Sequence, residues 1–138
     1  MKLNSRSLTA AFFALLIGAV PAVPVFAHHS FAAEFDSTKV VTLTGAVTKV
    51  EWTNPHARFY IDAKDSNGKL VNWNFELGSP NGLMRNGWRR DSLKIGEMVT
   101  VNCTLAKNDP HVGNARTVTL ASGKRMFAGS SEGDPATP

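Results

Sequence analysis

Residues 57–88 read ARFYIDAKDSNGKLVNWNFELGSPNGLMRNGW, and this stretch decides the fold. Apolar and polar residues alternate over Ala57–Lys64 and again over Lys69–Leu77, which is the period of a half-buried β-strand. The intervening Asp65–Gly68 contains Asn-Gly, and the readiness of this pair to adopt positive φ angles favours a hairpin turn. The stretch therefore predicts two antiparallel neighbouring strands.

A short helix is expected directly after the second strand. Ser79 has the side chain of an N-cap, and Pro80 suits the first helical position because its missing N–H would be unpaired there anyway. The helix is expected to continue over 81–86 and to end at Gly87 as the C′ residue. Trp88 is then expected to fold back onto the barrel.

Further strands are expected on both sides of this stretch. Val40–Trp52 alternates in the same way, and Gly45 within it indicates a bulge or a close backbone approach. Met98–Ala106, Ala115–Leu120 and a short extended piece at Lys124–Phe127 follow the helix. The sequence thus predicts an all-β protein, a small five- to six-stranded OB-like barrel with one short helix between strands three and four. A generic five- or six-stranded barrel or sandwich is the competing architecture.

The two ends of the chain lack this pattern. Lys2 and Arg6 precede an apolar core at Leu8–Val20, which is the pattern of a signal peptide. Ala27 is the last residue of a stretch with the small residues that signal peptidase requires at its cleavage site. We therefore expect export to the periplasm with cleavage after Ala27. The expected divisions are a signal peptide at 1–27, an N-terminal segment at 28–39, the barrel domain at 40–128 and a disordered tail at 129–138.

Composition narrows the functional classes. The 138 residues hold 15 Lys and Arg, 11 Asp and Glu and one Cys, and loss of Lys2 and Arg6 leaves a net charge of +2. This weak, dispersed charge argues against a nucleic-acid partner, and the apolar segment is too short to span a membrane. The motifs of phosphate loops, nucleophile elbows and metalloproteases do not occur, so no enzyme is indicated. Glu76, on the expected outer strand face, is the one carboxylate considered for catalysis.

The histidines carry the clearest chemistry. Cleavage after Ala27 makes His28 the N-terminal residue, whose α-amine and imidazole Nδ1 can chelate one metal ion. Such nitrogen donors suit Cu(II) first, with Ni(II) and Zn(II) behind it. His29 and His56 are the candidates for a third nitrogen. His56 is the better placed of the two, because it follows Asn54-Pro55 in the connection between the first two strands, where OB barrels bind ligands.

Other candidate residues have more ordinary interpretations. His111 lies in the connection before the fifth strand, and its loop is expected near the same barrel mouth as His56. Cys103 faces inward on a strand and is expected to be an inert buried thiol. Among the tryptophans, Trp73 is expected in the core, whereas Trp52 and Trp88 are left open as a stacking surface for a sugar or an aromatic ligand.

Several segments of the chain, in order, resemble one bacterial family. They are Ala27–Phe31 with Glu34–Asp36, VEWTNPHARFYID at 50–62, NWNFELGSPNGLMRNGW at 72–88, SLKIGEMVTV at 92–101 and ARTVTL at 115–120. This pattern is similar to the small exported proteins of domain of unknown function 6152. The resemblance implies a periplasmic OB-like barrel without an assigned activity, and it carries over His28, His29 and His56 as motif positions.

Two functions of different classes are consistent with the sequence. The first is a periplasmic metal-binding carrier or accessory protein, most readily for copper, that uses His28 with His29 or His56. The second is a metal-free OB-type binding module that holds a small molecule, a glycan or a partner protein. The expected partners are a metal ion or small ligand and a periplasmic protein, without nucleic acid or a membrane span.

Overall fold

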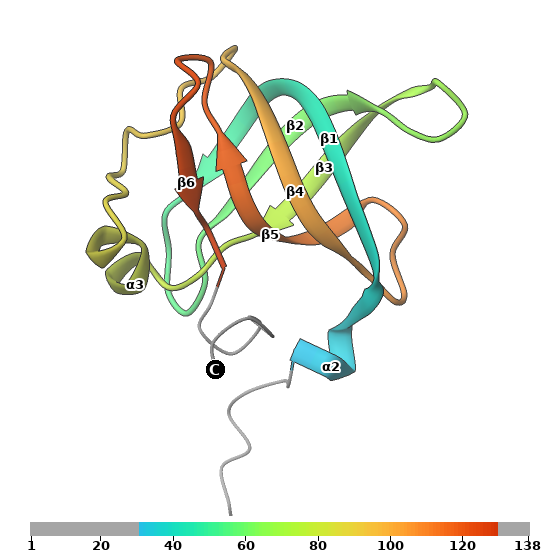
Figure 1. Ribbon diagram of the computed structural model, residues 1–138, viewed down its shortest axis with the longest axis horizontal. Helices are drawn as coiled ribbons and strands as arrows, with labels where there is room; N and C mark the ends of the chain where they lie inside the picture. The colour runs from blue at the N-terminus through green and yellow to red at the C-terminus, as the bar shows by residue number, and fades with distance from the viewer. Residues whose placement is uncertain (1–30, 130–138) are drawn as a thin grey trace, which may run out of the picture.

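Six strands form one sheet in the computed structural model, which describes residues 31–129 (Figure 1). The expected signal peptide, His28, His29 and the tail after Gly129 lie outside the described residues. In chain order the elements are α2 (Phe31–Glu34), β1 (Phe35–Glu51), β2 (Arg58–Lys64), β3 (Leu70–Glu76), α3 (Pro80–Arg85), β4 (Met98–Ala106), β5 (Val112–Thr119) and β6 (Arg125–Phe127).

The sheet closes on itself into a ring of five strands. Its order is β3-β2-β1-β4-β5-β6, and β3 also pairs in parallel with β5. All other neighbouring strands are antiparallel, and β6 lies outside the ring along β5. A closed five-stranded barrel with a helix between β3 and β4 is the OB arrangement, which confirms the expected fold class.

β1 is the longest strand, and it joins the two halves of the barrel. It pairs with β4 through its first half and with β2 through its second half. It begins at Phe35 rather than at Val40, because Phe35 pairs with Ala106 across an irregular stretch of register. Residues 36–39 are polar or charged and show no alternation, so the sequence pattern gave no sign of this extension.

The turn between β2 and β3 differs in detail from the expected one. Gly68 has φ +78°, but no non-glycine residue within 31–129 has a positive φ, so Asn67 does not share that conformation. The Asp65 side chain builds the turn instead, since its Oδ1 accepts hydrogen bonds from the backbone N–H groups of Asn67 and Lys69, at 2.8 and 2.9 Å. Aspartate commonly stabilises turns in this way.

The short helix α3 forms as its capping residues predict. Ser79 Oγ accepts a hydrogen bond from the Gly82 N–H at 3.2 Å, and Pro80 occupies the first turn. Gly87 follows the helix with φ +86°. Trp88 then returns to the barrel, where it is 2% exposed and its indole Nε1–H donates to the Phe127 carbonyl at 2.6 Å. The expected return of Trp88 is confirmed.

The barrel interior is filled by the inward residues of every strand of the ring. Gly45 allows β1 and β2 to approach closely, because a Cβ at this position would lie 2.2 Å from the Asp62 carbonyl oxygen. The most completely buried apolar side chains are Val47, Phe59, Ile61, Phe75, Leu77, Leu83, Trp88, Val99, Val101 and Val118. Among residues 31–129, no helix is long and apolar enough to cross a membrane.

Substitution of Gly45 by alanine tests this close approach. The added methyl group would collide with the β2 backbone, so we expect the Gly45→Ala variant to lose about 3 kcal/mol of unfolding free energy. Urea unfolding followed by tryptophan fluorescence measures the loss. Gly68→Asn is the matched control, because Asn tolerates a positive φ and the site is open. Equal midpoints for Gly45→Ala and the wild type would contradict the packing argument.

Candidate functional site

His56 lies at the end of the connection between β1 and β2, where the backbone is firmly held. The next residue, Ala57, donates its N–H to the Gly78 carbonyl at 3.1 Å and accepts from the Leu77 N–H at 2.8 Å. The His56 imidazole turns toward the same segment, and its Nδ1 lies 3.1 Å from the Leu77 carbonyl oxygen. The ring is thus fixed against the residues that follow β3, with 32% of the side chain exposed.

Glu76 connects His56 to the outer face of the sheet. One carboxylate oxygen, Oε1, lies 3.2 Å from His56 Nδ1, and the other, Oε2, accepts from Arg58 Nη2 at 2.6 Å. Arg58 also reaches the Asn74 side chain through Nη1, at 3.4 Å. Glu76 is only 8% exposed, because these neighbours cover it. We call His56, Arg58, Asn74 and Glu76 the Glu76 cluster.

The Glu76 cluster fixes which nitrogen of His56 carries the proton. Nδ1 faces two acceptors, the Leu77 carbonyl oxygen and a carboxylate oxygen, so in the neutral ring Nδ1 is the donor. Nε2 then holds the free lone pair, and no partner within residues 31–129 uses it. Metal-binding histidines commonly have this arrangement, with one ring nitrogen held by a carboxylate or carbonyl and the other facing the metal.

Helix α2, the first described element, is held against the barrel. Phe31 stacks on Phe35 with ring centroids 5.2 Å apart. Lys107 holds the helix to the start of the β4–β5 connection, since its N–H donates to the Glu34 carbonyl at 2.9 Å and its Nζ to the Ala32 carbonyl at 2.5 Å. In Figure 1, α2 lies below the barrel on the side of the β4–β5 connection, and the connection between β1 and β2 lies at the lower left, near α3.

The described residues alone do not assemble a metal centre. Within 31–129, no three His, Cys, Asp or Glu side chains lie together in a way that could hold a metal ion. His56 has Glu76 beside it but no third ligand from this part of the chain. His28 and His29, the other expected ligands, lie outside the described residues, so the expected copper site remains a prediction.

His111 occupies a different part of the barrel from His56. Its ring lies perpendicular to that of Trp73, with centroids 5.1 Å apart. Both rings line a cavity of about 750 Å³ at the opening of the barrel, which we call the mouth. His56 does not line the mouth, so the expectation that both loops border one opening is wrong. β1 and β4 run antiparallel, so the connections that leave their C-terminal ends lie at opposite ends of this strand pair.

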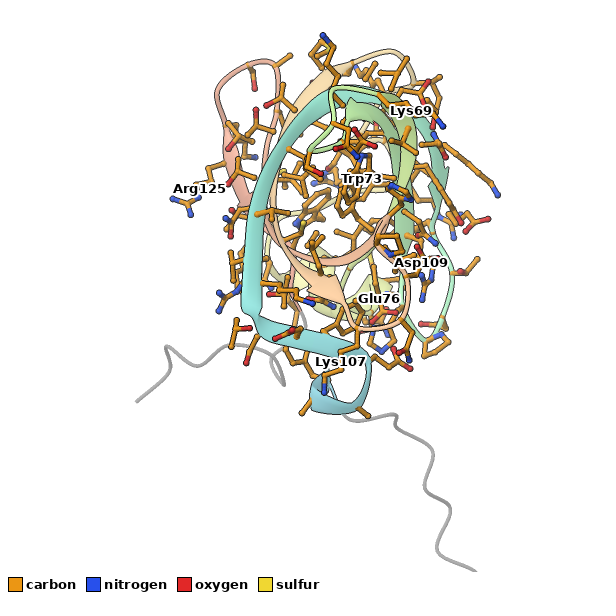
Figure 2. The ribbon with its side chains drawn as sticks, turned by 90° about the vertical axis from the view of Figure 1, so that its right-hand side faces the viewer. Lys69, Trp73, Glu76, Lys107, Asp109 and Arg125 are labelled. Atoms are coloured by element: carbon orange, nitrogen blue, oxygen red, sulfur yellow. The ribbon has the colours of Figure 1, made fainter. Side chains whose placement is uncertain are left out.

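The mouth is formed by three segments far apart in the sequence. They are the first half of β1, the β2–β3 turn and the β4–β5 connection. Figure 2 looks into this opening, with Trp73 inside the ring of strands, Asp109 toward its edge and Glu76 lower down, toward α2. Its lining includes Lys39, Val41, Leu43, Lys64, Asp65, Trp73, Leu105, Lys107, Asp109 and His111.

The remaining tryptophans do not provide an open stacking surface of two rings. Trp52 and Trp88 border a groove of about 340 Å³ together with Met84, Arg89 and Arg90. Trp88 is almost completely buried and hydrogen-bonded, so its role is structural. Trp52 is half-buried against the core. Trp73 is 5% exposed and belongs to the core, as expected.

A second polar group lies farther along the outer face of the sheet. Glu51 contacts Lys49 Nζ at 2.5 Å and accepts a hydrogen bond from the Tyr60 hydroxyl at 3.1 Å. These two contacts lower the pKa of Glu51 and, in turn, the Glu51 carboxylate raises the pKa of Lys49. Lys49 is exposed and both Glu51 and Tyr60 are partly exposed, so we assign them a structural rather than a chemical role.

Sequence reasoning missed the partners of Glu76 and the lysines of the mouth. Arg58 and Glu76 are direct partners in the β2–β3 register, but this register pairs Lys64 with Leu70, whereas the expected four-residue turn would pair Lys64 with Lys69, so counting outward from that turn would not have found the pair. Lys39, Lys64 and Lys107 come from three different connections or strands. Only closure of the ring brings these lysines around one opening, and no local pattern signals it.

The fold and the two sites define a small OB-like barrel with a histidine–carboxylate cluster outside and an open mouth. The chain matches the model of a family of unknown function, DUF6152, over residues 15–115, and it belongs to that family. No curated protein matches it. Among solved structures, the mitochondrial single-stranded DNA-binding protein Rim1 of S. cerevisiae is similar, with 11% identity and a TM-score of 0.45 over 63% of this chain and 94% of that chain.

Cys103 is the one thiol of the protein, and its environment predicts inertness. It is fully buried, and burial raises the pKa of its thiol to about 12. At pH 8 only about one molecule in ten thousand would hold the reactive thiolate. We expect iodoacetamide to leave the native protein unmodified for hours and to alkylate it within minutes in 6 M guanidinium, as mass spectrometry would record. Rapid labelling of the native protein would contradict the buried position.

Proposed function

We propose that the exported, cleaved protein is a periplasmic metal-binding carrier or accessory protein, with copper as the preferred metal. In this proposal His28 binds the ion through its α-amine and imidazole, and His56 supplies a further nitrogen through Nε2. His29 is the alternative donor. The observation that carries the proposal is the orientation of His56, whose Nδ1 is held by Leu77 and Glu76 so that Nε2 is left free.

The chemistry of the donors supports copper over harder ions. A terminal amine and two imidazoles are all nitrogen ligands, and Cu(II) binds such sets more tightly than the other divalent first-row metals. The amine titrates near pH 8 and imidazole near pH 6.5, so little work is needed to deprotonate them at neutral pH. Glu76, whose Oε1 lies 3.2 Å from Nδ1, would help to hold the His56 ring in this orientation.

The reach of the chain also supports the proposal. His28 precedes Phe31 by three positions along the chain, which allows the two α-carbons to lie up to about 10 Å apart. Phe31 is tied to the barrel by its stacking on Phe35 and by the bonds from Lys107 to α2. In Figure 2, Glu76 and Lys107 both lie on the lower side of the ring of strands, the side on which α2 lies. A short tether that starts on this side is compatible with an encounter between residue 28 and the Glu76 cluster.

The direct test is Cu(II) titration of protein that begins at His28, followed by electron paramagnetic resonance. We expect one ion per chain and hyperfine coupling to nitrogen. Addition of one glycine before His28 should abolish the tight site, because the α-amine moves away from the imidazole. The His56→Ala variant should weaken binding by at least tenfold. Equal affinity in the glycine-extended protein would contradict the proposal.

A second variant tests the role of Glu76 behind His56. Loss of the carboxylate charge in Glu76→Gln should weaken copper binding about tenfold, as for other groups that orient a metal-binding histidine. Glu51→Gln is the matched control, because Glu51 is also a hydrogen-bonded carboxylate of the outer face but has no contact with His56. Thermal unfolding of the metal-free proteins separates a binding effect from a loss of fold. Equal weakening by both substitutions would remove Glu76 from the site.

A second candidate function is the metal-free binding of a small molecule. The cavity of about 750 Å³ at the mouth favours it, because this volume lies in the range of small-molecule pockets. The mouth and the Glu76 cluster share no residue, so the two functions do not exclude one another.

A further inference from the structure

The interior of the barrel is filled at one end and hollow at the other. Along the inner face of β1, Val47 is 1% exposed, whereas Val41 and Leu43 are only partly buried although they pack against the same core. Leu105 on β4 is also partly buried. These three side chains line the mouth, so apolar surface that a sealed barrel would bury is open to a ligand.

Trp73 forms the inner wall of the mouth, and its indole N–H is an unpaired hydrogen-bond donor. Its side chain is 5% exposed, and its Nε1–H has no acceptor within residues 31–129. Buried donors are nearly always paired in folded proteins. An unpaired indole N–H in this wall favours an occupant with acceptor atoms over a pure hydrocarbon.

The rim of the mouth carries more available positive than negative charge. The rim holds three lysines, Lys39, Lys64 and Lys107, and two aspartates. The aspartates already accept hydrogen bonds from backbone N–H groups of the turns. Asp65 Oδ1 accepts two backbone N–H groups, and Asp109 Oδ1 accepts the His111 N–H at 2.9 Å.

The three lysines differ in the number of ion pairs and hydrogen bonds that they already form. Lys39 forms an ion pair with the half-buried Asp36, at 3.4 Å, and Lys107 uses one of its three donors on Ala32. Lys64 has no ion-pair partner in the described part of the chain. The rim therefore favours an anionic group at the entrance, because exposed lysines both attract and orient such a group.

We infer that the mouth binds an amphipathic organic anion. Its apolar body lies against Val41, Leu43 and Leu105, and its carboxylate or sulfonate lies at the rim between Lys39, Lys64 and Lys107. This inference rests on the second candidate function and is independent of copper. It goes beyond that function because it names the chemical class of the ligand.

Two fluorescent probes that differ in one group test the inference. 1-Anilinonaphthalene-8-sulfonate and N-phenyl-1-naphthylamine share an aromatic body, but only the first carries an anionic group. Titrated into the His28–Pro138 protein at low salt, the sulfonate should bind with one site per chain and at least fivefold tighter than the neutral probe. Its affinity should fall as salt rises, since salt screens the rim lysines.

Three variants assign the binding to the mouth. Leu43→Trp should fill the cavity and reduce the affinity for both probes at least tenfold. Lys64→Gln should weaken only the sulfonate, by about twofold to fivefold, the range of solvent-exposed ion pairs. Lys124→Gln is the matched control, because Lys124 is an exposed lysine outside the mouth and should change nothing. Near-ultraviolet circular dichroism must stay native, because loosened folds also bind such dyes.

The possible outcomes separate the claims. Equal binding of both probes, sensitive to Leu43→Trp, would keep small-molecule binding at the mouth and overturn the anionic class. Binding insensitive to Leu43→Trp, or no binding at all, would overturn both. If deletion of residues 130–138 were required before either probe bound, the occupant of the mouth would be the chain's own tail, and the inference would be wrong.

Discussion

The parallel pairing of β3 with β5 is the contact on which the rest of this structure depends. It joins Asn74, Phe75 and Glu76 to Val112, Gly113 and Asn114, and it turns an open sheet into a ring. Gly113 also lets β5 pack closely on β4, because a Cβ at this position would lie 3.2 Å from Cys103 Sγ. Once the ring is closed, the inward residues of all five strands share one core, and a sheet edge that would otherwise invite association with another chain is paired.

Closure also determines where the two candidate sites lie. Glu76 belongs to the closing segment, and its side chain points outward to hold His56 and Arg58. Trp73, which precedes that segment, points inward and lines the mouth. Neighbouring residues of one strand thus serve opposite faces of the barrel wall. The wall separates His56, with its free Nε2, from the cavity of the mouth, so each proposal can fail without the other.

Local patterns in the sequence predicted most of the elements, and long-range contacts account for most of the differences. Alternation identified β2, β3 and β4, and the capping residues Ser79 and Gly87 identified α3, because these signals act over a few residues. The first residues of β1 and β5 were missed because backbone pairing with distant strands, not alternation, makes them extended. For the candidate site, the position of His56 in a connection was readable. The contacts of its ring with Leu77 and Glu76, and the position of His111 by Trp73, required the folded barrel.

The closing seam is short compared with the other joints of the barrel. Three residue pairs hold β3 to β5, whereas eight hold β1 to β4. Local opening of a folded protein begins where the fewest contacts must break, so this seam is the place where the barrel would open first. Glu76 is one of the three residues that β3 contributes, and it also holds the His56 ring. Any ligand that immobilises His56 would therefore slow local opening of this seam. A ligand bound outside the barrel would in this way make the barrel itself more rigid.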